Sequence, residues 1–233
     1  MKTTKRITLF AITTLLTGLG ANAYAGYDNT IRLGEYFVHY DAQATDLTGT
    51  GIGADPPGVN MSTNDVQTPY FAYVRKLSPK FDLELAFGIP PKTTIVGKGP
   101  TKLGSVPYAG QEVATAKWVS PTVLLNYKFL DESSALRPYA GIGFNYTHFT
   151  DITATPAGQN ALGGPTSATL SNSLGWAATV GLSYRLQEHW SLYGSYSMSQ
   201  VKSDLAANTS GAIRTNTVDF RPSTIVLSVG YSF

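Results

Sequence analysis

Charged side chains alternate with apolar ones in three segments of this chain. Asp82 and Glu84 lie on one face of "FDLELAFGIP". Lys128 and Arg185 take the corresponding faces of "SPTVLLNYKF" and "SLGWAATVGLSYR". A carboxylate pair could act as general acid and general base in a hydrolase. The two cations favour another interpretation, because charges in a narrow interior are costly unless they are paired. We therefore expect a buried charge network that blocks ions and water, formed by Asp82, Glu84, Lys128 and Arg185.

The three histidines give little support for catalysis or metal binding. His39, His148 and His189 fall on different segments, without the spacing of a metal site. A Ser-His-acid site stays open as an alternative, because catalytic triads are assembled in space and the chain is rich in serine. Such a site would make the protein a lipid-modifying or proteolytic enzyme. We expect instead a protein that is not an enzyme and that needs no cofactor or metal.

The composition suits a wall between lipid and water. Only 14% of the 233 residues are charged, whereas aromatic residues reach 12% and include 14 tyrosines. Soluble domains average about 25% charged residues. The mean hydropathy is nevertheless close to zero. Such a mixture is expected when one face of the structure meets lipid and the other meets water.

The first 25 residues have the pattern of a secretory signal peptide. Lys2, Lys5 and Arg6 precede an apolar run over residues 7–19, and the small-x-small triplet "AYA" ends the segment. The run is too short for a membrane-spanning helix, which needs about 20 residues. Removing residues 1–25 takes away three cations, so that 14 Lys and Arg face 15 Asp and Glu, a net charge of −1. No basic patch favours a nucleic-acid partner.

The rest of the chain, residues 26–233, reads as one domain of β-strands. Cysteine is absent, so an exported fold must be held by its core or by closed hydrogen bonding. No later run of 18 apolar residues predicts a membrane-spanning helix. Alternating segments rich in Tyr, Phe and Val predict eight strands, near Thr30–Gln43, Asp65–Leu77, Phe81–Val96, Lys117–Phe129, Arg137–Asp151, Ser173–Leu186, Trp190–Ser203 and Thr217–Phe233.

The connections between these strands alternate in length. Ser78–Lys80, Asp131–Leu136 and Gln187–His189 are short. The long connections, rich in Gly, Pro, Thr and Asn, are expected to be loops, at Ala44–Asn64, Gly97–Ala116, Ile152–Asn172 and Asp204–Asn216. Short turns that alternate with long loops around an even number of strands are typical of an eight-stranded antiparallel transmembrane β-barrel, with the turns on the periplasmic side.

The two faces of the predicted strands differ in the way that such a barrel requires. One face is large and apolar, and the other is small, polar or charged, which fits the narrow interior of eight strands. A soluble barrel would place its apolar face inside. Aromatic residues gather beside the short turns and predict an interfacial girdle, made of Phe81, Tyr127, Phe129, Tyr184, Trp190, Tyr231 and Phe233. Tyr231 and Phe233, at the end of "TIVLSVGYSF", are also expected to form the signal read by the outer-membrane insertion machinery.

Several segments resemble the OmpW family of small outer-membrane β-barrels. "RPYAGIGFNYTHF" is similar to a family signature of the kind R-P-Y-x-G-x-G-x-N-Y-T-x-F. "FDLELAFGIP", "SPTVLLNYKF", "SLGWAATVGLSY" and the terminal "VGYSF" resemble further family strands in the same order. The chain departs from the family at Asn172-Ser173-Leu174-Gly175, where the family has Asp-Ser-Trp-Gly, and at Arg221-Pro222, where it has Asp-Pro.

The resemblance implies a monomeric barrel in the outer membrane of Gram-negative bacteria. It also implies a narrow apolar lumen through which small hydrophobic molecules pass. By motif position Ala86 and Leu174 would lie in the apolar constriction, while Leu124 interrupts an otherwise polar lumen face. Gly175 could introduce a bulge, which leaves the facing of Leu174 and Trp176 open. The expected ligand path is therefore Ala86, Leu124, Leu174 and Trp176. Simple packing inside a small barrel is the alternative.

Prolines interrupt otherwise regular strands. Proline has no N–H for a ladder, so each one marks an edge, a bulge or a break. In a closed barrel such a break would be a gap in the wall, through which an apolar solute could leave the lumen for the bilayer. The alternative is that these prolines only end strands above the membrane. The resemblance favours a lateral opening, for which the candidates are Pro90, Pro91, Pro121 and Pro222.

These observations predict an outer-membrane channel for the diffusion of small hydrophobic molecules. Its other partners would be outer-membrane lipids, lipopolysaccharide and the insertion machinery. The alternative is a structural, adhesive or receptor barrel that acts through its extracellular loops.

Overall fold

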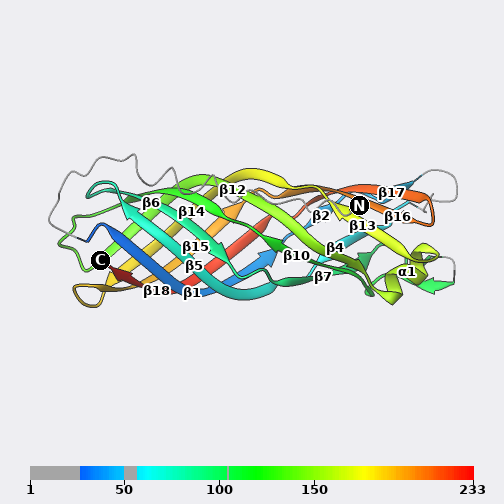
Figure 1. Ribbon diagram of the computed structural model, residues 1–233, viewed down its shortest axis with the longest axis horizontal. Coiled ribbons are helices and arrows are strands. Elements are labelled where there is room, and N and C mark those ends of the chain that lie inside the picture. Colours follow the sequence, from blue (N-terminus) through cyan, green and yellow to red (C-terminus); the bar gives the residue numbers. More distant parts are fainter. Residues whose placement is uncertain (1–26, 50–56, 104) are drawn as a thin grey trace, which may run out of the picture.

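The computed structural model describes residues 27–49, 57–103 and 105–233. The predicted signal peptide over residues 1–25 lies outside these described residues. Figure 1 shows an elongated molecule of long strands, in which the C-terminus lies near one end and β16 (Lys202–Thr209) and β17 (Ala212–Asp219) lie near the other.

Eight antiparallel strands close into a barrel. They are β1 (Asn29–Tyr40), β5 (Val66–Lys76), β6 (Phe81–Gly88), β11 (Thr122–Lys128), β12 (Leu136–Ala154), β14 (Ser173–Arg185), β15 (Trp190–Ser199) and β18 (Pro222–Ser232). Neighbours follow the order β11, β6, β5, β1, β18, β15, β14 and β12, and the pairing of β12 with β11 closes the ring. The predicted eight-stranded antiparallel barrel is confirmed.

Four of the eight predicted strands are interrupted where they leave the barrel. Phe81–Val96 divides into β6 and β7 (Lys92–Lys98), and Lys117–Phe129 contains the junction of β10 (Glu112–Val119) with β11. Trp190–Ser203 divides into β15 and β16, and Thr217–Phe233 into β17 and β18. The prediction of continuous strands in these four places is therefore wrong. Proline accounts for three of the interruptions because it supplies no N–H to a ladder.

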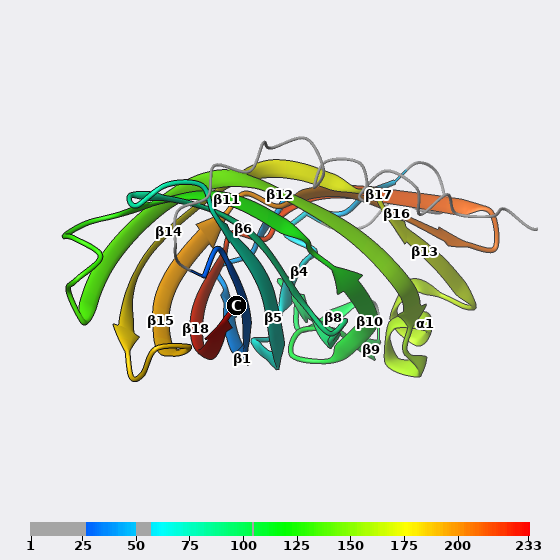
Figure 2. The ribbon, with the colours of Figure 1, turned by 60° about the vertical axis from the view of Figure 1, so that its left-hand side comes forward.

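The long connections, predicted as loops, contribute to two larger sheets beyond the barrel and contain the two-stranded sheet of β8 (Lys102–Leu103) and β9 (Val106–Pro107) (Figure 2). β4 (Asn60–Thr63), β7, β10 and the far end of β12 make one of them. β13 (Thr166–Leu170), β16, β17 and β2 (Gln43–Ala44) make the other, and β3 (Thr48–Gly49) pairs with β17. Apolar side chains scattered through these segments share a buried core. The sequence contains no long apolar run there that would have predicted this core. It includes Val59, Ile95, Tyr108, Val113 and Leu205.

One short helix, α1 (Pro156–Leu162), lies beside β10, close to β8 (Lys102–Leu103) and β9 (Val106–Pro107). The Thr155 hydroxyl accepts a hydrogen bond from the Gly158 N–H at its start, and Gly163 ends it with φ of 90°. In the described part of the chain, no helix combines the length and apolar character that crossing a bilayer would require.

Side chains alternate between the outside of the barrel and its lumen. Each of the eight strands exposes large apolar residues on the outside, among them Leu33, Phe71, Phe87, Leu125, Phe144, Val180, Tyr196 and Leu227. The lumen side carries small, polar or charged residues, such as Ala72, Ala86, Asn126, Thr179 and Ser228. Aromatic rings contact one another beside the short turns, in the groups Phe81–Tyr127–Phe129 and Trp190–Tyr231–Phe233.

The last strand pairs with the first over its whole length. The register runs from Thr30 opposite Ser232 to Tyr40 opposite Pro222. Beyond it, the Phe233 N–H donates to the Asn29 carbonyl at 2.8 Å, and the Asn29 N–H donates to the Phe233 carbonyl at 3.1 Å. The final residue of the chain thus takes part in the seam that removes the open edges of the sheet.

Close approach of β11 to β12 makes Gly143 a sensitive position in the closing ladder. A Cβ at Gly143 would lie 1.8 Å from the Val123 carbonyl oxygen, whereas one at Gly194 would meet only a Leu227 methyl group at 3.7 Å. We expect Gly143→Ala to lower the free energy of unfolding by about 1–3 kcal/mol, and Gly194→Ala to change it little. Equilibrium urea unfolding in detergent measures both. Equal stability of the two variants would contradict this assignment of the closing seam.

Candidate ligand cavity and its charged floor

A cavity of about 100 Å³ occupies the barrel lumen. The strand registers order its wall along the barrel. Glu84 lies opposite Leu124, Ala86 lies opposite Thr122, and Trp118, farther along, lies opposite Phe149. All six residues line the cavity. The cavity therefore has a charged end towards the periplasmic turns. Its aromatic end points towards the sheets beyond the barrel, which are called the extension below.

An ion pair forms the floor of the cavity. The Arg32 guanidinium donates to Glu84 Oε2 at 3.0 Å, and both side chains are almost wholly buried. Glu84 also accepts hydrogen bonds from the Tyr70 hydroxyl at 2.8 Å and from the Asn126 amide at 2.7 Å. The guanidinium stacks 3.8 Å from the centroid of the Tyr193 ring. Pairing with opposite charge and with hydrogen-bond donors makes a buried carboxylate tolerable, and the assembly lies between the cavity and the periplasmic side.

Arg32 belongs to the cavity floor, although the sequence pattern did not predict it as a site residue. It lies between Ile31 and Leu33, whose side chains face outward, so its alternation did signal an inward position. Its partner Glu84 lies 52 positions away along the chain, and only the pairing of β1 with β5 and of β5 with β6 brings the two together.

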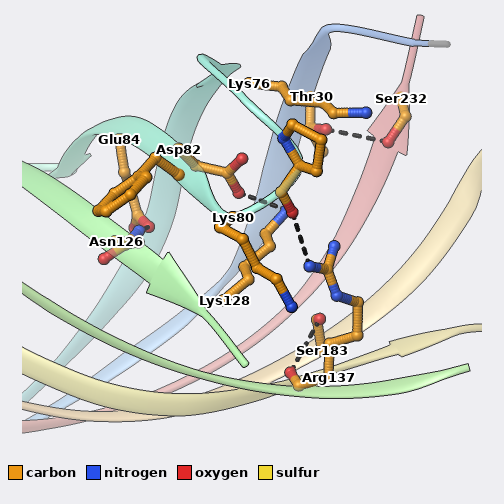
Figure 3. Close-up of polar contacts among 12 residues, drawn as sticks. Thr30, Lys76, Lys80, Asp82, Glu84, Asn126, Lys128, Arg137, Ser183 and Ser232 are labelled. Atoms are coloured by element: carbon orange, nitrogen blue, oxygen red, sulfur yellow. Dashed lines mark hydrogen bonds and ion pairs between the residues drawn. The ribbon is translucent and has the colours of Figure 1, made fainter. Parts of the chain in front are cut away.

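A second, polar cavity of about 270 Å³ lies below this floor. Lys128 forms an ion pair with the buried Asp82, and Figure 3 shows its ammonium directed at that carboxylate. Lys76 pairs in the same way with Glu132 in the turn after β11. The hydrogen bond from Lys76 lowers the pKa of Glu132 below its usual value. Asp82, Glu84 and Lys128 thus lie together at the periplasmic end, Glu84 above and the Asp82–Lys128 pair below.

Arg185 does not belong to this charge network, which corrects the prediction. Its guanidinium donates to the backbone carbonyls of Glu132 at 3.0 Å and Ser133 at 2.8 Å. The reason is its position at the end of β14, where its own N–H bonds to Ala135 in the adjacent turn. Arg137 acts similarly, donating to the Pro79 carbonyl of another turn at 2.8 Å (Figure 3). Both arginines fasten periplasmic turns together.

The wall between β6–β7 and β10–β11 lacks a registered ladder over a short interval. The β6–β11 register ends where Ala86 faces Thr122, and the β7–β10 register begins where Lys92 faces Lys117. This interval contains three prolines, Pro90, Pro91 and Pro121, and is called the proline interval below. Gly88 and Ser120 lie on its two sides, and both line the cavity. The cavity therefore extends to an interval of the barrel wall that has no registered ladder between β6–β7 and β10–β11.

Pro222 lies outside this interval. It begins β18, where it faces Tyr40 of β1 in a continuous register, and it is buried in the cavity wall. β18 is separated from β6 by β1 and β5. Arg221, just before it, has φ of 41°, so the bend between β17 and β18 is made without opening the ladder to β1.

The four residues predicted for the ligand path divide into two pairs. Ala86 and Leu124 are buried and line the cavity. Leu174 and Trp176 point outward, with exposed fractions of 73% and 49%, so their assignment to the lumen is wrong. The register of β14 with β12 runs without a bulge from Ser173 onward, so Gly175 takes the inward position between them.

A polar network lines one side of the cavity beside the proline interval. The Asn145 amide donates to Ser120 Oγ and to Thr122 Oγ1, each at 2.8 Å. Thr147 donates to Asn145 Oδ1 at 2.9 Å and lies 2.7 Å from Ser120 Oγ. Alternation places Thr122 on the lumen face, but no pattern in the sequence indicates that the four side chains form one network.

Aromatic rings line the other end of the cavity. Phe149 and Phe220 stack with their centroids 5.3 Å apart, and Tyr40 and Trp118 pack against the same cluster. The Trp118 indole N–H donates to Thr93 Oγ1 at 2.9 Å. The cavity is therefore apolar and aromatic towards the extension, polar along one wall and charged at its floor.

The histidines make three separate contacts. His39 bonds to Asp65 at 2.8 Å, His148 to Asn172 Oδ1 at 2.7 Å and His189 to the Ser232 carbonyl at 2.8 Å. The hydrogen bond from His39 lowers the pKa of Asp65. Within the described residues, no group of three His, Asp or Glu side chains could hold a metal ion.

The closed antiparallel barrel, its apolar outer surface and its aromatic contacts beside short turns define a bacterial outer-membrane β-barrel protein. The OmpW family model matches residues 27–233. This chain therefore belongs to the OmpW family and resides in the outer membrane of Gram-negative bacteria, in contact with its lipids.

The relatives agree with this assignment over most of the chain. Outer membrane protein W of Escherichia coli K12 is 28% identical over 233 residues, which cover 98% of this chain and 100% of the relative. Outer membrane protein W of Vibrio cholerae serotype O1 is 30% identical over 122 residues, covering 52% and 55% of the two chains. The crystal structure of OprG from Pseudomonas aeruginosa is similar with a TM-score of 0.79 and 25% identity, covering 89% of this chain and 96% of OprG.

The floor predicts a characteristic pattern of stability changes. Glu84→Leu leaves Arg32 buried without its carboxylate and should lower the free energy of unfolding by about 3–5 kcal/mol. Arg32→Met combined with Glu84→Leu removes both charges and should restore most of that loss. Urea unfolding followed by tryptophan fluorescence tests the pair. A double variant as unstable as Glu84→Leu would show that the ion pair is not what makes Glu84 necessary.

Proposed function

We propose that this protein is a channel through which small hydrophobic molecules diffuse across the lipopolysaccharide barrier and leave sideways into the bilayer. The observation that carries the proposal is the cavity that reaches the proline interval while a buried ion pair closes its floor. A solute inside has a polar, charged end below it and a weakly bonded wall beside it.

The energetics of an apolar solute favour the sideways route. Passing the floor would require the solute to displace Arg32 and Glu84 from each other, which leaves buried charges unpaired. Passing the proline interval requires no exchange of ladder hydrogen bonds, because Pro90, Pro91 and Pro121 have no N–H to donate. The hydrocarbon of the bilayer is also the solvent that an apolar solute prefers.

The outer surface at the interval suits such an exit. Phe87 and Ile89 flank it and are 43% and 52% exposed, so a solute that leaves the lumen there meets an apolar surface at once. The Ile89 N–H is held by the Pro69 carbonyl at 3.1 Å, which anchors β6 to β5 while the other side of the interval lacks a ladder.

Two further features belong to this proposal. A single barrel contains the cavity, the floor and the interval, so we propose that a monomer suffices for transport. Tyr231 and Phe233 expose 41% and 48% of their surfaces at the end of the last strand. We propose that the outer-membrane insertion machinery recognises this terminal strand during assembly.

A charge introduced into the cavity should stop transport without unfolding the barrel. Leu124→Arg should reduce protein-dependent flux of a labelled apolar solute into vesicles by at least about tenfold, because burying a charge costs more than the roughly 1.4 kcal/mol that a tenfold change represents. Leu124→Met keeps the wall apolar and should retain flux. Unchanged flux in Leu124→Arg, or flux through the natural protein no faster than in protein-free vesicles, would refute the proposal.

Restoring backbone donors to the interval should narrow the exit. The triple variant Pro90→Thr, Pro91→Thr, Pro121→Thr supplies N–H groups that can extend the two ladders towards each other, so its flux should fall severalfold. Pro222→Thr is the matched control, because Pro222 lies outside the interval, and it should transport normally. A triple variant with full flux would place the exit elsewhere.

A further inference from the structure

The polar network beside the proline interval consists of Ser120, Thr122, Asn145 and Thr147. All of its side-chain N–H and O–H groups donate hydrogen bonds to acceptors within the protein. Asn145 Oδ1 can only accept, so the hydroxyl of Thr147 donates to it. Thr147 has then used its only hydrogen, so the bond of 2.7 Å to Ser120 is donated by the Ser120 hydroxyl. The Thr122 hydroxyl donates to the Ser120 carbonyl at 3.3 Å, and both amide hydrogens of Asn145 are used as well.

What the network can still offer a ligand is lone pairs. A hydroxyl oxygen accepts up to two hydrogen bonds. Ser120 and Thr122 each accept one from Asn145, and Thr147 accepts one from Ser120. One acceptor position therefore stays available on each of these three oxygens, whereas no donor does.

Two other hydroxyls of the cavity wall also give their hydrogens to groups of the protein. Thr179 receives the Ser197 hydroxyl at 2.9 Å while donating to a backbone carbonyl, and at the floor the Tyr70 hydroxyl donates to Glu84. The wall also contains apolar side chains such as Leu124 and further hydroxyls on Tyr36, Ser195 and Thr224. A ligand that fits the network around Asn145 has an apolar body and one hydrogen-bond donor.

We propose that the cavity selects small apolar molecules carrying a hydroxyl or other N–H or O–H donor, such as phenols and alcohols, over hydrocarbons and ethers of the same shape. This inference rests on the proposed function and names the substrate class of its path. Ser120 is the residue before Pro121, so a donor bound to the network holds its solute at the edge of the proline interval. A hydrocarbon gains nothing from these lone pairs, and an ether presents only an acceptor to them.

Trp118 provides an internal reporter of occupancy. The chain has three tryptophans, of which Trp118 lines the cavity whereas Trp176 and Trp190 are exposed on the outer surface. The variant Trp176→Phe, Trp190→Phe leaves Trp118 alone inside. Trp118→Phe leaves the two outer tryptophans, which report the concentration of a probe in the surrounding lipid. Bromobenzene, para-bromoanisole and para-bromophenol are quenchers with the same bromine and ring and differ in their hydrogen bonding.

The concentrations of the three probes are compared at equal quenching of the outer tryptophans. Under that condition para-bromophenol should quench Trp118 at about fivefold lower concentration than the other two probes, because one additional hydrogen bond strengthens its binding by about that factor. Ser120→Ala with Thr122→Val in the Trp118-only protein should abolish this preference and keep quenching by bromobenzene. Thr30→Val with Ser191→Ala removes two hydroxyls from the lower polar cavity and should keep the preference. Thr122→Val alone serves if the double variant fails to fold.

The outcomes separate this inference from the function on which it rests. Equal quenching of Trp118 by all three probes overturns the donor preference and leaves the hydrophobic path intact. A preference that survives Ser120→Ala with Thr122→Val overturns the role of the network. If none of the probes reaches Trp118 while the outer tryptophans are quenched, the cavity is not a solute site and both proposals fall.

Discussion

Every peptide N–H and C=O group at the depth of the hydrocarbon needs a partner within the protein, because lipid offers none. The barrel meets this requirement by closing β12 onto β11 and by pairing β18 with β1, a seam that the backbone bonds between Phe233 and Asn29 continue. A wall under that constraint can open only where the donors are missing. Three prolines supply such a place, and the ladders on either side fix where it lies. The position of the lateral exit that we propose thus follows from the same rule that closes the rest of the barrel.

Buried charge sets the other limit on what the lumen can do. Arg32 and Glu84 are tolerable in the interior because they pair with each other, and because Tyr70 and Asn126 also donate to the carboxylate. Breaking these contacts would leave buried charges unpaired, which makes the floor difficult to open. Above it the network around Asn145 is also internally satisfied, but through oxygens that can still accept. In the function that we propose, one polar assembly closes the path and the other gives it chemical preference.

Alternation along the strands was enough to predict the closed barrel and the inward facing of Asp82, Glu84, Ala86 and Leu124. It could not pair residues that are distant in the chain, so Arg32 and the network of Ser120, Thr122, Asn145 and Thr147 required the registers between strands. The family motif suggests that Leu174 and Trp176 face the lumen. Strict alternation along β14, which continues through Gly175, places both side chains on the outside instead. The sheets beyond the barrel were hidden because their core is assembled from isolated apolar residues in loop-like sequence.

The central claim is that solute occupies the lumen above the ion pair and leaves between β6–β7 and β10–β11. A crystal structure with a brominated apolar solute tests it most directly, because anomalous scattering locates each bromine. We predict bromine sites beside Leu124 and Ser120 and in the proline interval near Gly88, with none below Glu84. Bromine sites in the lower polar cavity beside Lys128, with the upper cavity vacant, would contradict it.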